Sequence, residues 1–211
     1  MKTILQRKIS FFIVLLLPLL LSVEAPQVEM SNGRLKKESR QTIFETIISL
    51  SWEQRKCSDI SNRYDNLRVP VAEAKRIPGS IPYYGANGIQ DYVDGYTHNG
   101  EFVLVAEDGA NDLKNYPVQY VNGHIWVNNH AHVLQSNEMN STIFLKYLIN
   151  SADIESVLVG GGRAKLNANV LMDLKFIVPK KNEQSKISSL LGSVDKVITL
   201  HQRNTISLCL T

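Results

Sequence analysis

Four polar side chains with hydrogen-bonding capacity lie close together among apolar residues in the segment 126–134: Asn128, Asn129, His130 and His132. The flanking tryptophan, valine and leucine residues predict a strand through this segment. Asparagine and histidine form strands poorly, however, and are costly to bury without partners. Three kinds of partner would satisfy them: an internal hydrogen-bond network, a metal ion, or a ligand with donors and acceptors of its own, such as the edge of a DNA base.

A metal site is the first alternative. In one continuous strand, His130 and His132 would point to the same side and could reach one ion, with Glu107 and Asp108 as further ligands of a metal-dependent hydrolase. The sequence contains no His-Glu-x-x-His motif and no paired cysteines. It therefore favours an internal network, in which the four Asn and His side chains bond to the turn at 107–109. We expect no metal, no cofactor and no catalytic residue.

A glycine-rich loop at 160–167 carries three side chains suited to nucleic acid: Arg163, Lys165 and Asn167. Glycines allow a backbone to approach a ligand closely, and the loop lacks the closing Gly-Lys-Ser/Thr of a nucleotide-binding P-loop. Arginine suits a guanine edge or a phosphate, lysine a phosphate, and asparagine an adenine edge. The alternative interpretation is a surface loop with solvated charges.

A second cluster combines aromatic and amide side chains beside a glycine turn: Tyr84, Asn87 and Gln90. Such residues are frequent in nucleic-acid contacts and also in ordinary hairpins. This cluster ranks second to the glycine-rich loop as a predicted DNA contact.

The remaining pattern predicts a mixed α+β domain over residues 51–180, with a mostly antiparallel sheet and peripheral helices. The apolar run 102–106 indicates a buried strand, and Ser141 and Thr142 indicate the start of a helix over 143–149. Strands are also expected at 118–121 and 125–134, joined by an Asn122-Gly123 hairpin, and at 174–178. Apolar residues at three- and four-residue steps over 187–198 predict a helix that packs against a partner helix.

The charge distribution limits the possible partners of this 211-residue chain, whose formal net charge is +3. Residues 51–180 hold twelve Lys and Arg against fourteen Asp and Glu, so the central domain is not generally basic. Nucleic-acid binding would require a local basic patch or partner proteins that supply further phosphate contacts. Two distant cysteines, Cys57 and Cys209, favour a reducing compartment over a disulfide framework.

The first 50 residues have a different character. Residues 1–25 combine early basic residues with an apolar run, a pattern typical of an export signal or a membrane tether. Residues 26–50 are a polar linker that ends in a short predicted amphipathic helix. An exported or membrane-tethered binding protein is therefore the second functional alternative, beside a cytoplasmic one.

The order of motifs is more specific than any single motif. The succession runs from Trp52 through IPYYGANGI at 81–89, LVAEDG at 104–109, WVNNHAHVL at 126–134, GGRAKLN at 161–167 and LKFIVP at 174–179 to a helix opening near Glu183. Over residues 52–204 it resembles one target-recognition domain of the DNA specificity subunit of type I restriction–modification systems.

The resemblance implies a non-catalytic subunit that reads one half of a split DNA sequence. The helix after the domain would act as a spacer and dock an adenine methyltransferase subunit, to which a restriction subunit is added. The sequence departs from the family in having one recognition domain, a hydrophobic start, and a spacer helix that ends by residue 211 and is poorly continued after 201. It could pair with a second copy of itself through the spacer helix, or be a remnant that folds without assembling.

Overall fold

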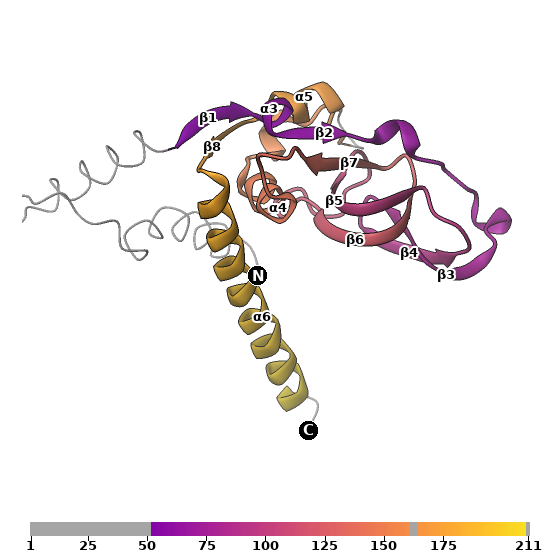
Figure 1. The fold of residues 1–211 in the computed structure, drawn as a ribbon. Helices are drawn as coiled ribbons and strands as arrows, with labels where there is room; N and C mark the ends of the chain where they lie inside the picture. The colour runs from indigo at the N-terminus through magenta and orange to yellow at the C-terminus, as the bar shows by residue number, and fades with distance from the viewer. Residues whose placement is uncertain (1–51, 161–163, 210–211) are drawn as a thin grey trace, which may run out of the picture.

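The computed structural model describes residues 52–160 and 164–209, shown in colour in Figure 1. The hydrophobic segment 1–25, the linker and short helix predicted for 26–50, and Arg163 lie outside these ranges. Within the described ranges, no helix is both long enough and apolar enough to cross a membrane.

The described elements are short except for the last helix. The strands are β1 (Glu53–Lys56), β2 (Ser61–Arg63), β3 (Pro78–Gly85), β4 (Gly88–Val93), β5 (His98–Ala106), β6 (Val118–Val127), β7 (Ala131–Ser136) and β8 (Lys175–Val178). The helices are α3 (Cys57–Ile60), α4 (Thr142–Ser151), α5 (Ala168–Asp173) and α6 (Lys181–Cys209), with single 3-10 turns at Asp65–Leu67, Glu73–Lys75 and Glu155–Val157.

Six strands form the main sheet in the order β2-β7-β5-β6-β3-β4. All neighbouring pairs are antiparallel except β3 and β6, which pair in parallel. Helix α4 packs beside this sheet and contacts both β5 and β6 (Figure 1). The domain is therefore α+β with a mostly antiparallel sheet and peripheral helices, as the sequence predicted.

Two local expectations were wrong. Asn122 and Gly123 do not form a hairpin turn, because β6 runs through them and Gly123 pairs with Gly100 of β5. The segment 126–134 is not one strand either: it breaks at residues 128–130, between β6 and β7. The two errors have opposite causes. At Asn122 and Gly123 the long-range pairing with β5 overrides the local turn preference, whereas at 128–130 the poor strand-forming tendency of asparagine and histidine prevails.

The short β6–β7 link requires a strongly coiled sheet. Strand β5 lies between β6 and β7, with Ile125 opposite His98 and Ala131 opposite Ala106. Extended β5 would span about 26 Å between those two partners. The six-residue step from Ile125 to Ala131 spans at most about 22 Å, even when fully extended. The sheet must therefore bend along β5 and β6.

Gly100 and Gly123 supply this bend. They are cross-strand partners, and their φ angles are 136° and 100°. Residues with a Cβ rarely adopt this backbone region, so glycine at both positions lets β5 and β6 turn together.

The ends of the domain meet in a separate two-stranded sheet, in which β1 pairs with β8. Helix α6 begins at Lys181, three residues after β8, and its first turns pack against α4 through buried Ile187 and Leu191. The sequence predicted a truncated spacer helix over 181–211, with a poor continuation after residue 201, and the helix continues through that stretch to Cys209. Its second half extends away from the domain (Figure 1).

Candidate nucleic-acid interface

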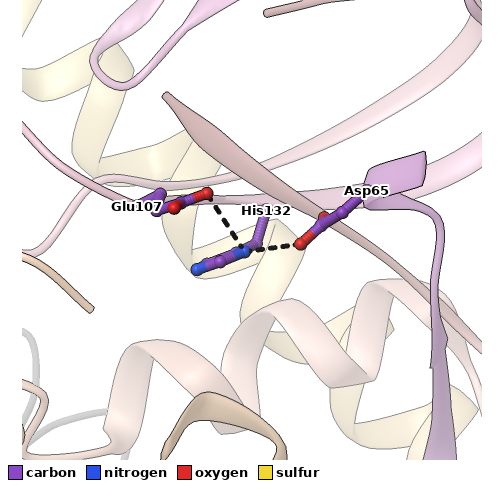
Figure 2. A group of neighbouring side chains, drawn as sticks. All are labelled: Asp65, Glu107 and His132. Atoms are coloured by element: carbon purple, nitrogen blue, oxygen red, sulfur yellow. Dashed lines mark hydrogen bonds and ion pairs between the residues drawn. The ribbon is translucent and has the colours of Figure 1, made fainter. Parts of the chain in front are cut away.

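A buried histidine joins two carboxylates beneath the loop that follows β5. The Nδ1 atom of His132 lies 2.7 Å from an Asp65 carboxylate oxygen and 3.7 Å from a Glu107 carboxylate oxygen (Figure 2). Its Nε2 atom lies 2.9 Å from the carbonyl oxygen of Leu166. Both ring nitrogens therefore lie within hydrogen-bond distance of protein oxygens. His132 thereby links the turn at Asp65 to the chain leaving the glycine-rich loop.

Arg68 is the cation at the centre of this cluster. It donates to Glu107 at 2.7 Å and to the carbonyl oxygens of Ala131 and Asp65 at 2.9 and 3.0 Å. The Arg68 and Glu107 side chains are only 16% and 15% exposed. A guanidinium with several fixed donors suits such a partly buried position, where each charge needs a partner. Arg68 therefore ties together three separate chain segments.

Lys165 occupies the outer side of the same carboxylate. Its Nζ atom lies 2.8 Å from the second Glu107 oxygen, and its side chain is 46% exposed. The backbone around it is fixed, because Lys165 forms isolated β-bridges with Asp108 and Val159 and the Leu166 amide donates to the Glu107 carbonyl at 2.7 Å. The described end of the glycine-rich loop is thus anchored to the loop after β5.

The charges of this pair follow from its surroundings. Burial alone would raise the pKa of Glu107, but hydrogen bonds from Lys165 and Arg68 outweigh burial and hold that pKa below its usual value. The same hydrogen bond to Glu107 raises the pKa of Lys165. Both groups are therefore ionised at neutral pH.

These contacts bear on the metal alternative. Among the described residues, the group of acids and histidines whose ligand atoms lie within 4.8 Å of one another is Asp65, Glu107 and His132, without His130. Both nitrogens of His132 already face protein oxygens, and Arg68 and Lys165 neutralise Glu107. A cation would have to displace these two positive charges and a hydrogen bond. The arrangement is that of an ion-pair cluster.

Asn128 and His130 also have partners within the protein. The buried Asn128 side chain donates to the Gln90 side chain at 3.2 Å and accepts from the His130 amide at 2.8 Å. His130 contacts Asp108 through Nδ1 at 2.5 Å, and its carbonyl accepts from the Glu107 amide at 2.8 Å. Asn129 is exposed. The turn at 128–130 is therefore bonded to the loop after β5 and to the β3–β4 hairpin.

The aromatic and amide cluster lies on that hairpin, and its members differ in role. Asn87, in the hairpin turn, donates to the Gly109 carbonyl at 2.9 Å and accepts from the Asn111 amide at 2.9 Å, so both ends of its amide hold the loop after β5. Gln90 is exposed. Tyr84 is half-buried, and burial, followed by its neighbour Tyr92, raises its pKa.

The loop after β5 thus connects the glycine-rich loop with the aromatic and amide cluster, which are far apart in the sequence. Lys165 bridges to this loop from one side and Asn87 bonds to it from the other. Asn167 is exposed at the start of α5, and its side chain has no hydrogen-bond partner among the described residues. Lys165, Asn167 and Gln90 are exposed: Lys165 bridges to the loop after β5, Asn167 follows Leu166, whose amide bonds to Glu107, and Gln90 contacts Asn128 in the β6–β7 turn.

Sequence reasoning missed Asp65 and Arg68. They lie about 100 residues before the end of the glycine-rich loop, and the segment Asp-Asn-Leu-Arg forms only a single 3-10 turn. The one available signal was the three-residue spacing of opposite charges, which is common on protein surfaces.

Comparisons with known proteins identify the family of the chain. The family model described as the type I restriction modification DNA specificity domain matches residues 50–208. A Haemophilus influenzae protein named as a type I restriction enzyme specificity subunit is 39% identical over 158 residues, which are 74% of this chain and 41% of the relative. The EcoprrI specificity subunit of Escherichia coli is 25% identical over 125 residues, 59% of this chain and 30% of the relative.

Solved structures show the same fold. The S subunit of a type I restriction–modification system from M. genitalium superposes with a TM-score of 0.61 at 14% identity, over 82% of this chain and 48% of that one. The HsdS subunit from Thermoanaerobacter tengcongensis gives 0.53 at 11% identity, over 94% and 46%. The chain belongs to the type I restriction–modification DNA specificity domain family. It spans less than half the length of the curated relatives it matches.

Proposed function

We propose that this chain is a non-catalytic DNA target-recognition module of a type I restriction–modification system. The observation that carries the proposal is the family match across residues 50–208, which includes the whole described sheet domain and nearly all of α6. The module would read one part of a DNA sequence in the cytoplasm and direct an adenine methyltransferase subunit and a restriction subunit to it. The free, buried thiol of Cys57 is compatible with that reducing compartment.

We place the DNA contact around the loop after β5. Lys165 offers an exposed cation for a phosphate, and Asn167 and Gln90 offer exposed amides for base edges. Arg163 and Tyr84 complete the proposed contact residues. Asn87 belongs to the same surface, but it would act by holding the loop, because both ends of its amide bond to loop backbone.

The contact assignment is tested by equilibrium binding of the full chain to duplex DNA over a range of salt concentrations. Lys165→Gln should weaken binding to every duplex and reduce the slope of log affinity against log salt by about one, because one phosphate contact is lost. Lys175→Gln is the matched control, since Lys175 is an exposed lysine on β8 in the other sheet. Equal affinities and slopes for both variants and the unmodified chain would refute the role of Lys165.

Base reading is tested separately, with the modification subunit co-expressed and methylated adenines mapped by sequencing. Asn167→Ala should relax or change the methylated sequence while leaving the salt slope unchanged, because a base contact contributes about 1–3 kcal/mol of discrimination and no counterion release. An unaltered methylation pattern in Asn167→Ala and Gln90→Ala would exclude these amides from base reading. Absence of any methylation with the unmodified chain would contradict the proposed function itself.

A further inference from the structure

One carboxylate in the proposed interface is shared by two cations that differ in exposure. Glu107 accepts from Arg68 on its inner side and from Lys165 on its outer side, at 2.7 and 2.8 Å. The Arg68 side chain is 16% exposed and the Lys165 side chain 46%. The inner contact is enclosed by protein, whereas the outer contact meets solvent.

Lys165 is free to exchange partners through its side chain alone. Its amide and carbonyl both bond to Val159, at 2.8 and 2.9 Å, which fixes the main chain. The lysine side chain has a flexible four-carbon stem, so a change of rotamer can move its ammonium away from Glu107 while the backbone stays in place. No rearrangement of the sheet is needed for this movement.

We propose that Glu107 is a specificity-determining residue that competes with DNA phosphate for Lys165. In the free protein the carboxylate holds the lysine and lowers its availability to any passing phosphate. In the bound protein the lysine transfers from Glu107 to a phosphate. The proposal rests on the proposed DNA-binding function. It adds a residue that opposes binding, so that DNA making few other contacts with the protein is bound less tightly.

The exchange is inexpensive because Glu107 keeps a partner when Lys165 leaves. The Arg68 guanidinium still donates to it, and the His132 ring remains 3.7 Å away. A partly buried carboxylate left with no cation would resist the exchange strongly. Lys165 can therefore dissociate from Glu107, whereas Arg68 remains bound to it.

A double-mutant cycle tests this competition with the full chain and a random-sequence duplex, using fluorescence anisotropy at several salt concentrations. Glu107→Gln should raise affinity about two- to fivefold at low salt, the range that half-exposed ion pairs contribute, with an unchanged salt slope. In the Lys165→Gln background the same substitution should have a much smaller effect. Glu155→Gln, which neutralises an exposed carboxylate, controls for the general loss of a negative charge.

The outcomes separate this inference from the proposed function. If Lys165→Gln leaves affinity and slope unchanged, Lys165 does not contact DNA and the competition is refuted, whereas the DNA-recognition function is tested separately by the methylation experiment. If Lys165→Gln weakens binding but Glu107→Gln has the same effect in both backgrounds, only the competition is refuted.

Folding is checked by thermal unfolding of each variant. Should Glu107→Gln not fold because Arg68 is left unpaired, the cycle is repeated in the Arg68→Met background, which replaces the inner ion pair by neutral groups of similar size. In that background too, Glu107→Gln is expected to raise DNA affinity when Lys165 is present and to have a much smaller effect in the Lys165→Gln variant. An equal effect in the presence and absence of Lys165 would overturn the competition.

Discussion

At the residue scale, Arg68 is the side chain on which the proposed interface depends most. It donates to the turn at Asp65, to Ala131 at the start of β7 and to Glu107 in the loop after β5. Lys165 forms an isolated β-bridge with Asp108 of this loop, the residue next to Glu107. Loss of Arg68 would therefore leave a partly buried carboxylate and two carbonyl oxygens without this partner, beneath the surface that we propose contacts DNA.

We expect Arg68→Met to lower the free energy of unfolding by about 2–4 kcal/mol, because it breaks one side of a largely buried ion pair. Arg55→Met is the matched control, since Arg55 pairs with Glu53 where the two side chains are 51% and 68% exposed. That variant should change stability by less than about 0.5 kcal/mol. Urea unfolding followed by circular dichroism measures both. Similar losses in the two variants would contradict the central role of Arg68.

At the element scale, the sequence predicted those elements whose signals are local. The apolar run at 102–106 lies in β5, and α4 begins where Ser141 caps it by accepting from the Phe144 amide. The turn of the β3–β4 hairpin precedes Gly88, which has a φ of 120°. These features follow from neighbouring residues, so a single sequence is sufficient to find them.

The elements that the sequence missed depend on distant partners. Gly123 lies inside β6 opposite Gly100 of β5, and no residue near 123 predicts this pairing. The pairing of β1 with β8 joins segments about 120 residues apart. The candidate site was predicted in part for the same reason. The sequence indicated Glu107, His130 and His132 because acidic and histidine side chains are recognisable candidates. Asp65 and Arg68 have a role only through contacts with distant residues, so the sequence did not indicate them.

The bend of β5 and β6 can be tested with two glycines that differ in backbone conformation. Gly123→Ala should destabilise the domain by about 1–3 kcal/mol, because its φ of 100° strains any residue with a Cβ, although no atom lies within 4 Å of that Cβ. Gly192→Ala in α6 should stabilise by about 0.5–1 kcal/mol, since its Cβ meets the Tyr147 hydroxyl at an ordinary 3.7 Å.

Opposite signs for the two substitutions, measured by urea unfolding, would support the assignment of Gly123 to the bend. A Gly123→Ala variant as stable as the unmodified chain would show that β6 does not need the left-handed conformation at that position.

At the scale of the whole molecule, the arrangement of the chain ends directs α6 outward. The β1–β8 pair closes the domain, and α6 starts immediately after β8. The Tyr147 hydroxyl and the Lys146 ammonium of α4 both contact Asp195, which holds the first half of the helix. Beyond this contact Val197 and Leu200 are 66% and 58% exposed. An extended helix with an exposed apolar side is marginal alone and gains stability from a partner helix.

We expect the second half of α6 to associate with the same helix of a second copy, as the paired arrangement of two recognition modules would require. Val197→Asp and Leu200→Asp together should shift the chain from dimer to monomer in sedimentation equilibrium, because each places a charge in the apolar contact. Thr199→Asp is the control, as Thr199 is exposed on an adjacent position of the same helix turn. A chain that is monomeric at all concentrations without substitution would refute self-association, and would leave a partner subunit as the expected binder of this helix.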